Sequence, residues 1–179
     1  MLDKSSLRLE LRKVLSQLPD TTKAAASASL RSQLEASLVF MQGITIAVFY
    51  PTASEPRILP LIALPGKSFL FPLCHADRSL TWHRPDNIHL WQPGPFGIIE
   101  PIPALAPAIH APPFDLVLVP GLAFTRRGAR LGHGAGFYDR FLASISPNLS
   151  TISLCFDCQI VPFLPTEAHD IRVQQVLHA

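Results

Sequence analysis

DLVLVPGLAFTRRGARLGHGAGFYDR, residues 115–140, is the most informative stretch of the chain. It begins with the apolar run Leu116–Val119, which ends at a proline and predicts a strand buried on both faces. Residues 126–140 then contain four arginines and four glycines in a basic loop and the segment after it, and Phe137–Leu142 has the composition of a helix start. This order is typical of a phosphate pocket, because glycine lets backbone N–H groups approach an anion and arginine adds forked donors.

The glycine spacing excludes two common phosphate fingerprints. Residues 132–136 read G-x-G-x-G, so they lack the two-residue gap of a dinucleotide-binding turn, and no Gly-Lys-Ser/Thr ending of a Walker loop follows. A plain strand-to-helix turn remains an alternative for these glycines. The arginine cluster argues against it, because clustered like charges repel unless a ligand or solvent takes them up.

The rest of the chain alternates between helical and apolar extended patterns. Amphipathic helices are predicted over 4–18 and 22–38, with further helices near 56–64 and 136–146. Strands are predicted near 44–49, 68–72, 79–83, 116–120 and 151–156. Eight prolines between 85 and 113 indicate an extended connection in place of a helix. We therefore expect one α/β domain over residues 1–179, with a mostly parallel sheet and helices on both faces in three layers.

The composition limits the function classes. Hydrophobic residues make up 48% of the chain and charged residues 16%, which describes a globular protein with a sizeable core. A net charge of +2 with only local clustering argues against a nucleic-acid partner. Because no apolar run is long enough to span a membrane and the N-terminus has no hydrophobic signal core, we expect no membrane partner and a cytoplasmic location. We also expect a monomer.

The three cysteines argue against a disulfide framework. Cys155 and Cys158 have the C-x-x-C spacing, so a metal or redox role must be weighed. No second Cys/His pair at ligand spacing accompanies them, and they follow an apolar strand where a redox motif would precede a helix. Two buried or half-buried thiols are the favoured interpretation.

The chain closely resembles the 5-formyltetrahydrofolate cyclo-ligase family. The resemblance is carried by Val119–Phe124 and by the R-G-x-R-L-G-x-G-x-G-x-Y-D-R run from Arg127 to Arg140. It extends over most of the chain through a set of shorter matches: the N-terminal K-x-x-L-R at residues 4–8, the strand ending at Pro51, F-L-F-P at 69–72, G-x-x-E-P at 97–101 and E-x-H-D at 167–170.

This resemblance implies an ATP-driven cyclisation of 5-formyltetrahydrofolate to 5,10-methenyltetrahydrofolate. The γ-phosphoryl group of ATP would be transferred to the formyl oxygen, and ADP and phosphate would be released. Such chemistry depends on positioning and charge neutralisation more than on a protein nucleophile. The implied small molecules are therefore a reduced folate, ATP and Mg²⁺.

The resemblance also implies roles for particular residues. Arg130 and Tyr138 are expected to be catalytic, and Asp139 and Asp170 are expected to hold Mg²⁺. Thr52, Glu55, Arg57, Trp82 and Tyr138 are expected to bind the folate. ATP contacts are expected at Lys4, Arg8, Arg127, Gly128, Arg130, Leu131, Gly132, His133, Gly134, Ala135, Gly136, Phe137 and Tyr138.

Simpler interpretations exist for several of these side chains. Lys4 and Arg8 share one helix face, which on sequence alone is most simply a solvated face. Asp139 is also suited to the first turn of a helix. Of Phe137 and Tyr138, one suits core packing and the other suits stacking on a flat heterocycle such as a pterin.

The chain departs from the family pattern at four positions. Arg57 stands where the family has an acidic residue linked to the folate, so Glu55 is the candidate to replace it. Thr125, Gln174 and His178 replace an aspartate, an aspartate and a threonine. The alternative function is therefore a nucleotide- or phosphate-binding regulatory protein of the same fold, with a degenerate folate pocket.

Overall fold

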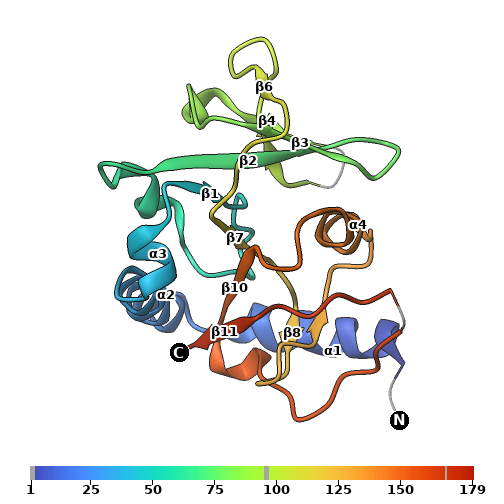
Figure 1. The fold of residues 1–179 in the computed structure, drawn as a ribbon. Coiled ribbons are helices and arrows are strands. Elements are labelled where there is room, and N and C mark those ends of the chain that lie inside the picture. Colours follow the sequence, from blue (N-terminus) through green and yellow to red (C-terminus); the bar gives the residue numbers. More distant parts are fainter. Residues whose placement is uncertain (1–2, 95–96, 168) are drawn as a thin grey trace.

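The computed structural model describes residues 3–94, 97–167 and 169–179, and its centre is a mixed seven-stranded sheet (Figure 1). The strand order is β11-β10-β7-β1-β2-β3-β6. The five strands from β11 to β2 are parallel, and β3 and β6 extend the sheet in antiparallel fashion. The bounds are β1 Thr45–Ala47, β2 Ser68–Cys74, β3 Leu80–His83, β6 Ala108–Ile109, β7 Leu116–Leu118, β10 Ser150–Cys155 and β11 Gln175–His178.

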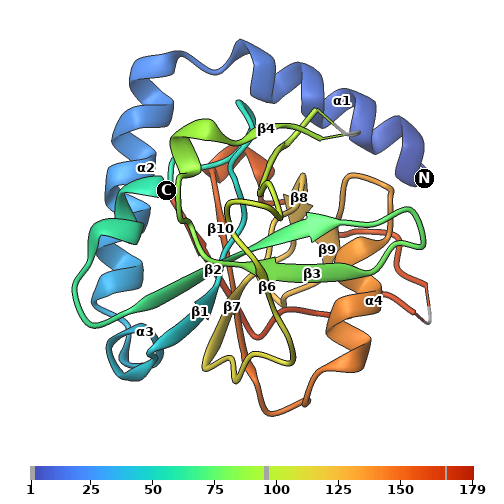
Figure 2. The same ribbon diagram turned by 90° about the horizontal axis from the view of Figure 1, so that it is seen from above.

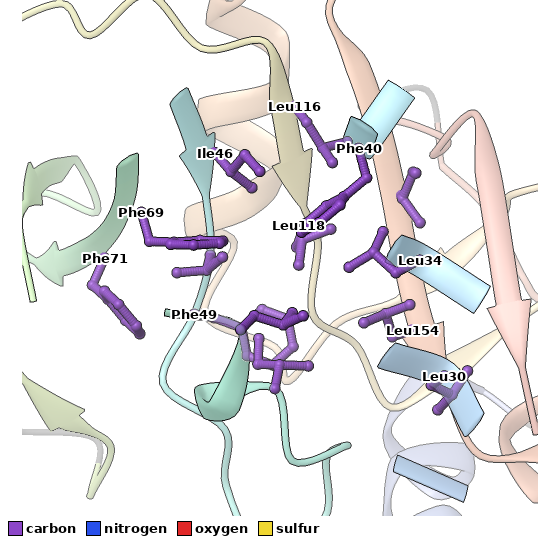
Figure 3. Packing of buried hydrophobic residues seen from close by; sticks show 14 of the residues in the cluster. Leu30, Leu34, Phe40, Ile46, Phe49, Phe69, Phe71, Leu116, Leu118 and Leu154 are labelled. Atoms are coloured by element: carbon purple, nitrogen blue, oxygen red, sulfur yellow. The ribbon is translucent and has the colours of Figure 1, made fainter. Parts of the chain in front are cut away.

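Helices cover both faces of this sheet. Alternate strand residues face opposite sides. Ile46, Leu116, Leu118 and Leu154 pack against α2 (Asp20–Glu35) and α3 (Leu38–Gln42), as Figure 3 shows. Ala47, Val117 and Val119 pack on the other side against α4 (Phe137–Ser144). The predicted three-layer α/β fold with a mostly parallel sheet is confirmed.

The helix α1 (Lys4–Gln17) lies outside these layers, at the carboxyl end of β7 (Figures 1 and 2). Its Leu11 packs against the small hairpin formed by β8 (Ala123–Phe124) and β9 (Arg130–Leu131), which directly follows β7. Its Leu15 packs against Phe156 at the end of β10. Since ligands of open α/β sheets bind beyond the carboxyl ends of the strands, α1 covers the expected site.

The structure differs from the predicted elements in three places. The helix expected near 56–64 is a short 3₁₀ helix, η1 (Leu59–Ala63), which cannot continue because its C-cap residue Leu64 is followed by Pro65. The helix expected over 22–38 is divided into α2 and α3, and Ser37 caps the second. The loop expected between residues 120 and 136 contains the β8–β9 hairpin, whose strands are too short to give a periodic pattern.

The proline-rich connection is extended, as predicted. It contains the 3₁₀ turn η2 (Ile88–Leu90) and the small hairpin of β4 (Gln92–Pro93) and β5 (Ile99–Glu100). A third 3₁₀ turn, η3 (Asp157–Gln159), follows β10. Among the helices of the described residues, none is long and apolar enough to cross a membrane.

Candidate active site

A cavity of about 700 Å³ lies between α1, the β9–α4 connection, the segments that follow β1 and β2, and the β4–β5 hairpin. The residues that line it come from all of these elements. They include Lys4, Arg8, Arg12, Thr52, Glu55, Cys74, Glu100, Arg130, Leu131, Gly132, His133, Gly134, Ala135, Gly136, Phe137, Tyr138, Asp139 and Asp170. Most of the residues predicted for ATP are therefore brought together, although they are far apart in sequence.

One wall of the cavity is the glycine loop, residues 132–136. Gly134 and Gly136 have φ of 111° and 77°, a region that side-chain-bearing residues rarely adopt. Gly136 is the N-cap residue of α4, so the positive end of that helix is directed toward the loop. The loop thus presents backbone N–H groups and a helix N-terminus to the cavity, which is the chemistry that binds an anion.

Arg130 supplies a buried positive charge next to this loop. Its side chain is only 3% exposed, and its guanidinium group forms an ion pair with Asp139 in the first turn of α4. Nη1 also donates to the carbonyl oxygen of Pro120 at 3.4 Å, whereas Nε has no hydrogen-bond partner among the described residues. The guanidinium group is therefore held in place by its partners and retains unpaired N–H donors, Nε among them, within the described residues.

The helix α1 adds three cationic side chains. Arg8 donates through Nε to the carbonyl oxygen of Gly132 at 2.9 Å, and Arg12 donates to that of His133 at 3.3 Å. Lys4 Nζ lies 2.7 Å from Asp170 and 2.9 Å from Glu167. Lys4 and Arg8 therefore do not form a merely solvated face. Arg12 was not predicted for the site, although Arg12 follows Arg8 by one helical turn and so lies on the same face of α1.

The contact between Lys4 and Asp170 shifts both pKa values. Burial alone would favour the neutral form of each side chain. The hydrogen bonds between them, with the attraction of the opposite charges, outweigh burial, so the pKa of Lys4 is raised and that of Asp170 is lowered. Both groups are charged in the folded protein at neutral pH.

The side of the cavity near β1 and β2 contains buried polar groups. The hydroxyl group of Tyr138 is buried and has no hydrogen-bond partner among the described residues. Burial, followed by the negative charge of Glu55, raises the pKa of Tyr138 well above the usual value, so it remains a neutral donor. Glu55 accepts from Thr52 through both N (2.8 Å) and Oγ1 (2.9 Å), and its other oxygen lies 3.2 Å from His133 Nε2.

Sequence reasoning gave no role to two further residues of this region, Cys74 and Glu100. Cys74 is the last residue of β2, and Glu100 ends β5 within the G-x-x-E-P segment. Burial, then a hydrogen bond to the Glu100 carboxylate and its charge, raise the pKa of the Cys74 thiol to about 12. The motif containing Glu100 was visible in the sequence, but only the fold shows that this carboxylate faces the cavity.

Four residues predicted for the site are not among those lining the cavity. Arg127 lines a separate cavity of about 790 Å³, with Arg126 and Arg172. Gly128 is in the turn of the β8–β9 hairpin, where its carbonyl oxygen accepts from Val173 N at 2.9 Å. Arg127 and Gly128 were predicted to contact ATP, but they lie in the turn of the β8–β9 hairpin, outside the cavity that the glycine loop lines.

The other two, Trp82 and Arg57, have structural partners. Trp82 is buried and packs edge-on against Phe114, with ring centroids 4.8 Å apart, and against Phe141. Arg57 forms an exposed ion pair with Asp20, the first residue of α2.

The remaining departures from the family pattern also have structural partners. Thr125 accepts a hydrogen bond from Ala129 N at 3.1 Å inside the hairpin turn. Gln174 donates to the carbonyl oxygens of Pro147 and Leu149, and His178 pairs with Asp157. Ala168, within the E-x-H-D match at 167–170, lies outside the described residues.

No group of three or more His, Cys, Asp or Glu side chains that could hold a metal ion by itself occurs within residues 3–94, 97–167 and 169–179. This covers the C-x-x-C pair, whose Cys155 is buried and Cys158 partly buried, both as free thiols. Asp139 and Asp170 both line the cavity, each paired with a cationic side chain.

Comparison with known proteins agrees with this geometry. A family model described as the 5-formyltetrahydrofolate cyclo-ligase family matches residues 1–179. The 5-formyltetrahydrofolate cyclo-ligase of Mycolicibacterium smegmatis is 33% identical over 184 residues, which covers 97% of this chain and 92% of that protein. The mouse enzyme of the same name is 36% identical over 96 residues, covering 51% of this chain and 43% of that protein.

Two solved structures share the fold. The 5,10-methenyltetrahydrofolate synthetase of Aquifex aeolicus superposes with a TM-score of 0.83 at 26% identity, over 98% of this chain and 89% of the other. That of Mycoplasma pneumoniae has a TM-score of 0.78 at 19% identity, over 98% of both chains, which supports the fold alone. With the match over its whole length, this chain belongs to the 5-formyltetrahydrofolate cyclo-ligase family.

Proposed function

We propose that this protein is an ATP-dependent 5-formyltetrahydrofolate cyclo-ligase that forms 5,10-methenyltetrahydrofolate, ADP and phosphate. The observation that supports this proposal is that one cavity combines a glycine loop and the cationic side chains next to it with the buried polar groups of Tyr138, Glu55 and Glu100. Both halves are needed, because ATP and a reduced folate must meet inside one site. We propose a monomeric state and a cytoplasmic location with this activity.

The glycine loop and α1 are proposed to bind the triphosphate of ATP. Backbone N–H groups at Gly134 and Gly136 would donate hydrogen bonds to the phosphate oxygens. The side chains of Lys4, Arg8 and Arg130 would neutralise the charge of the phosphates. Arg8 is already tied to the loop through Gly132. Little rearrangement would then be needed when the nucleotide binds.

The reaction requires the formyl oxygen of the folate to attack the γ-phosphorus of ATP. The bond from the γ-phosphorus to the bridging oxygen of ADP breaks, and ADP leaves. N10 then attacks the activated formyl carbon and loses its proton to solvent. The bond from this carbon to the phosphorylated oxygen breaks, and phosphate departs as the ring closes. Arg130 is proposed to stabilise the transferred group, and neutral Tyr138 to donate a hydrogen bond to the reacting end of the folate.

Mg²⁺ is proposed to accompany ATP. Magnesium in such sites is held by one or two carboxylates with the phosphates of the substrate, so a cage of protein ligands is not required. Asp139 and Asp170 fit this requirement because both line the cavity. When bound there, the ion would neutralise charge on the phosphates. Each aspartate would then divide its carboxylate between the ion and its present partner, Arg130 for Asp139 and Lys4 for Asp170.

Nothing in the structure favours the regulatory alternative. It rested on Arg57, whose partner is Asp20 and which does not line the cavity. The test is a spectrophotometric assay for methenyltetrahydrofolate with 5-formyltetrahydrofolate, ATP and Mg²⁺. The proposal predicts turnover that needs both substrates. Folded protein that binds ATP without any folate turnover would contradict it.

A further inference from the structure

The carboxylate of Glu100 is buried in the wall of the cavity without a cationic partner. The residue is 5% exposed, and it ends β5 of the β4–β5 hairpin, where it is paired with Gln92. Its Oε1 has no hydrogen-bond partner within the described part of the chain, and no ion pair of Glu100 occurs there. Burying an ionised carboxylate in this way is costly unless donors reach it.

The surroundings of Glu100 fix its position. A Cβ atom at Gly94 would lie 2.0 Å from Oε2, so the glycine gives this carboxylate its room. The thiol of Cys74 is hydrogen-bonded to the Glu100 carboxylate, and its raised pKa keeps it a protonated, neutral donor. Glu100 lines the cavity, and Oε1 is the oxygen of its carboxylate that is left without a partner among the described residues.

Glu55, the other buried carboxylate of the cavity, differs in this respect. One of its oxygens accepts two hydrogen bonds from Thr52, and the other faces His133 at 3.2 Å. Both oxygens of Glu55 therefore already have partners in the protein. An ionised carboxylate only accepts hydrogen bonds, so the unpartnered oxygen of Glu100 is completed by a ligand that brings N–H donors.

We propose that Glu100 recognises the pyrimidine edge of the reduced folate. This inference rests on the proposed function, which makes the ligand a reduced pterin. The pyrimidine ring of a reduced pterin carries an N3–H group and a 2-amino group side by side. The 2-amino group would donate to the unpartnered Oε1, and N3–H would donate to a remaining lone pair of Oε2. Glu100 would then orient the ring and select for the 2-amino group.

The selectivity follows from what a wrong ligand leaves unpaired. A site built to hydrogen-bond a substrate N–H rejects an analogue that lacks it, because its own buried polar group then loses its partner. A folate without the 2-amino group would leave one oxygen of Glu100 unsatisfied. The carboxylate of Glu100 and the 2-amino group of the ligand can each be changed independently.

The test is a cycle of two proteins and two ligands. Calorimetry with a non-hydrolysable ATP analogue present measures the Kd of 5-formyltetrahydrofolate and of its 2-desamino analogue, for the wild type and for Glu100→Gln. Glu35→Gln, an exposed glutamate at the end of α2, is the matched control. The wild type and control should prefer the 2-amino ligand by roughly 10- to 100-fold, the range of a hydrogen bond to a charged group. Glu100→Gln should reduce this preference at least fivefold and leave the affinity for the ATP analogue unchanged.

Unchanged discrimination in folded Glu100→Gln, or a wild type that binds both ligands equally, would overturn the assignment of Glu100. Folding is checked by thermal unfolding of each variant. Because Kd is measured without turnover, the outcome is independent of catalysis. A wild type that binds 5-formyltetrahydrofolate with this preference yet does not convert it would contradict the proposed reaction and leave the role of Glu100 supported. Failure of the wild type to bind either folate would overturn both.

Discussion

The guanidinium group of Arg130 is paired with the carboxylate of Asp139, so the end of the β8–β9 hairpin is joined to the first turn of α4 inside the cavity. The arginine is almost fully buried, while the aspartate is one-quarter exposed. The pair holds two groups of opposite charge where ATP and its metal ion are proposed to bind. Each partner can therefore be tested separately.

Replacing Arg130 by alanine should lower kcat/KM for ATP by about 10- to 100-fold, corresponding to about 1.5–3 kcal/mol for a charge-assisted contact. Arg127→Ala is the matched control, because Arg127 has the same chemistry but lines a different cavity. Steady-state kinetics with varied ATP measure both. A larger effect at Arg127 than at Arg130 would show that the hairpin turn, and not the cavity, holds the nucleotide.

Asp139→Asn keeps the shape of the side chain and removes its charge. We expect lower activity that is partly restored by excess Mg²⁺, because the substitution weakens a metal contact. The measurement is activity against Mg²⁺ concentration, at saturating ATP and folate. If the Mg²⁺ dependence stays as in the wild type, Asp139 serves only to pair with Arg130.

Gly128→Ala should destabilise folding by several kcal/mol without changing the KM for ATP of the folded fraction. The residue has φ of 81°, and an added Cβ would lie 2.0 Å from the carbonyl oxygen of Val173. Gly66→Ala is the control, because Gly66 has φ of 76° but no atom within 4 Å of its added Cβ, so only about 1–2 kcal/mol of backbone strain is expected there. Urea unfolding measures both, and equal losses would contradict the predicted clash.

Arg57→Glu should leave folate binding nearly unchanged, because the arginine pairs with Asp20 outside the cavity. The exposed ion pair contributes little to stability, and the change should shift the free energy of unfolding by no more than about 1 kcal/mol. The KM for folate is measured at low and high salt. A rise in KM that is larger at low salt would instead indicate that Arg57 meets the anionic tail of the folate.

The pair of Lys4 and Asp170 should make the attachment of α1 dependent on pH. The lowered pKa of Asp170 gives stability that is present above its unfolded pKa of about 4 and is lost as pH falls through the folded value. The raised pKa of Lys4 gives stability present below about 10 and lost as pH rises through the folded value.

Asp170→Asn should therefore flatten the acid limb of the stability curve. The free energy of urea unfolding, measured from about pH 2 to 6, tests this against the wild type. An acid limb of unchanged slope in the variant would show that Asp170 contributes nothing to it.

The sequence predicted the layers because apolar runs such as Leu116–Val119, which is buried throughout, alternate with helical patterns. It did not predict β11 or the β8–β9 hairpin, since two to four residues are too few for a periodic signal and their pairing partners are distant in the chain.

The glycine loop, Lys4 and Arg8 were predicted for the site through the family motif, and the structure brings them to one cavity. Trp82 was predicted to bind the folate but packs against Phe114, because the sequence around an aromatic residue does not show whether it faces a ligand or the core. Glu100 was left without a role because the burial that makes its carboxylate unusual arises only when β5 meets β2.

Transfer of the γ-phosphoryl group of ATP to the formyl oxygen of the folate can be followed with 5-formyltetrahydrofolate that carries ¹⁸O in the formyl group, incubated with the protein, ATP and Mg²⁺. We expect one ADP per methenyltetrahydrofolate and the ¹⁸O label in the inorganic phosphate, because the carbon–oxygen bond of the formyl group breaks while the new oxygen–phosphorus bond stays. Cyclisation with unlabelled phosphate and the label in water would rule this transfer out.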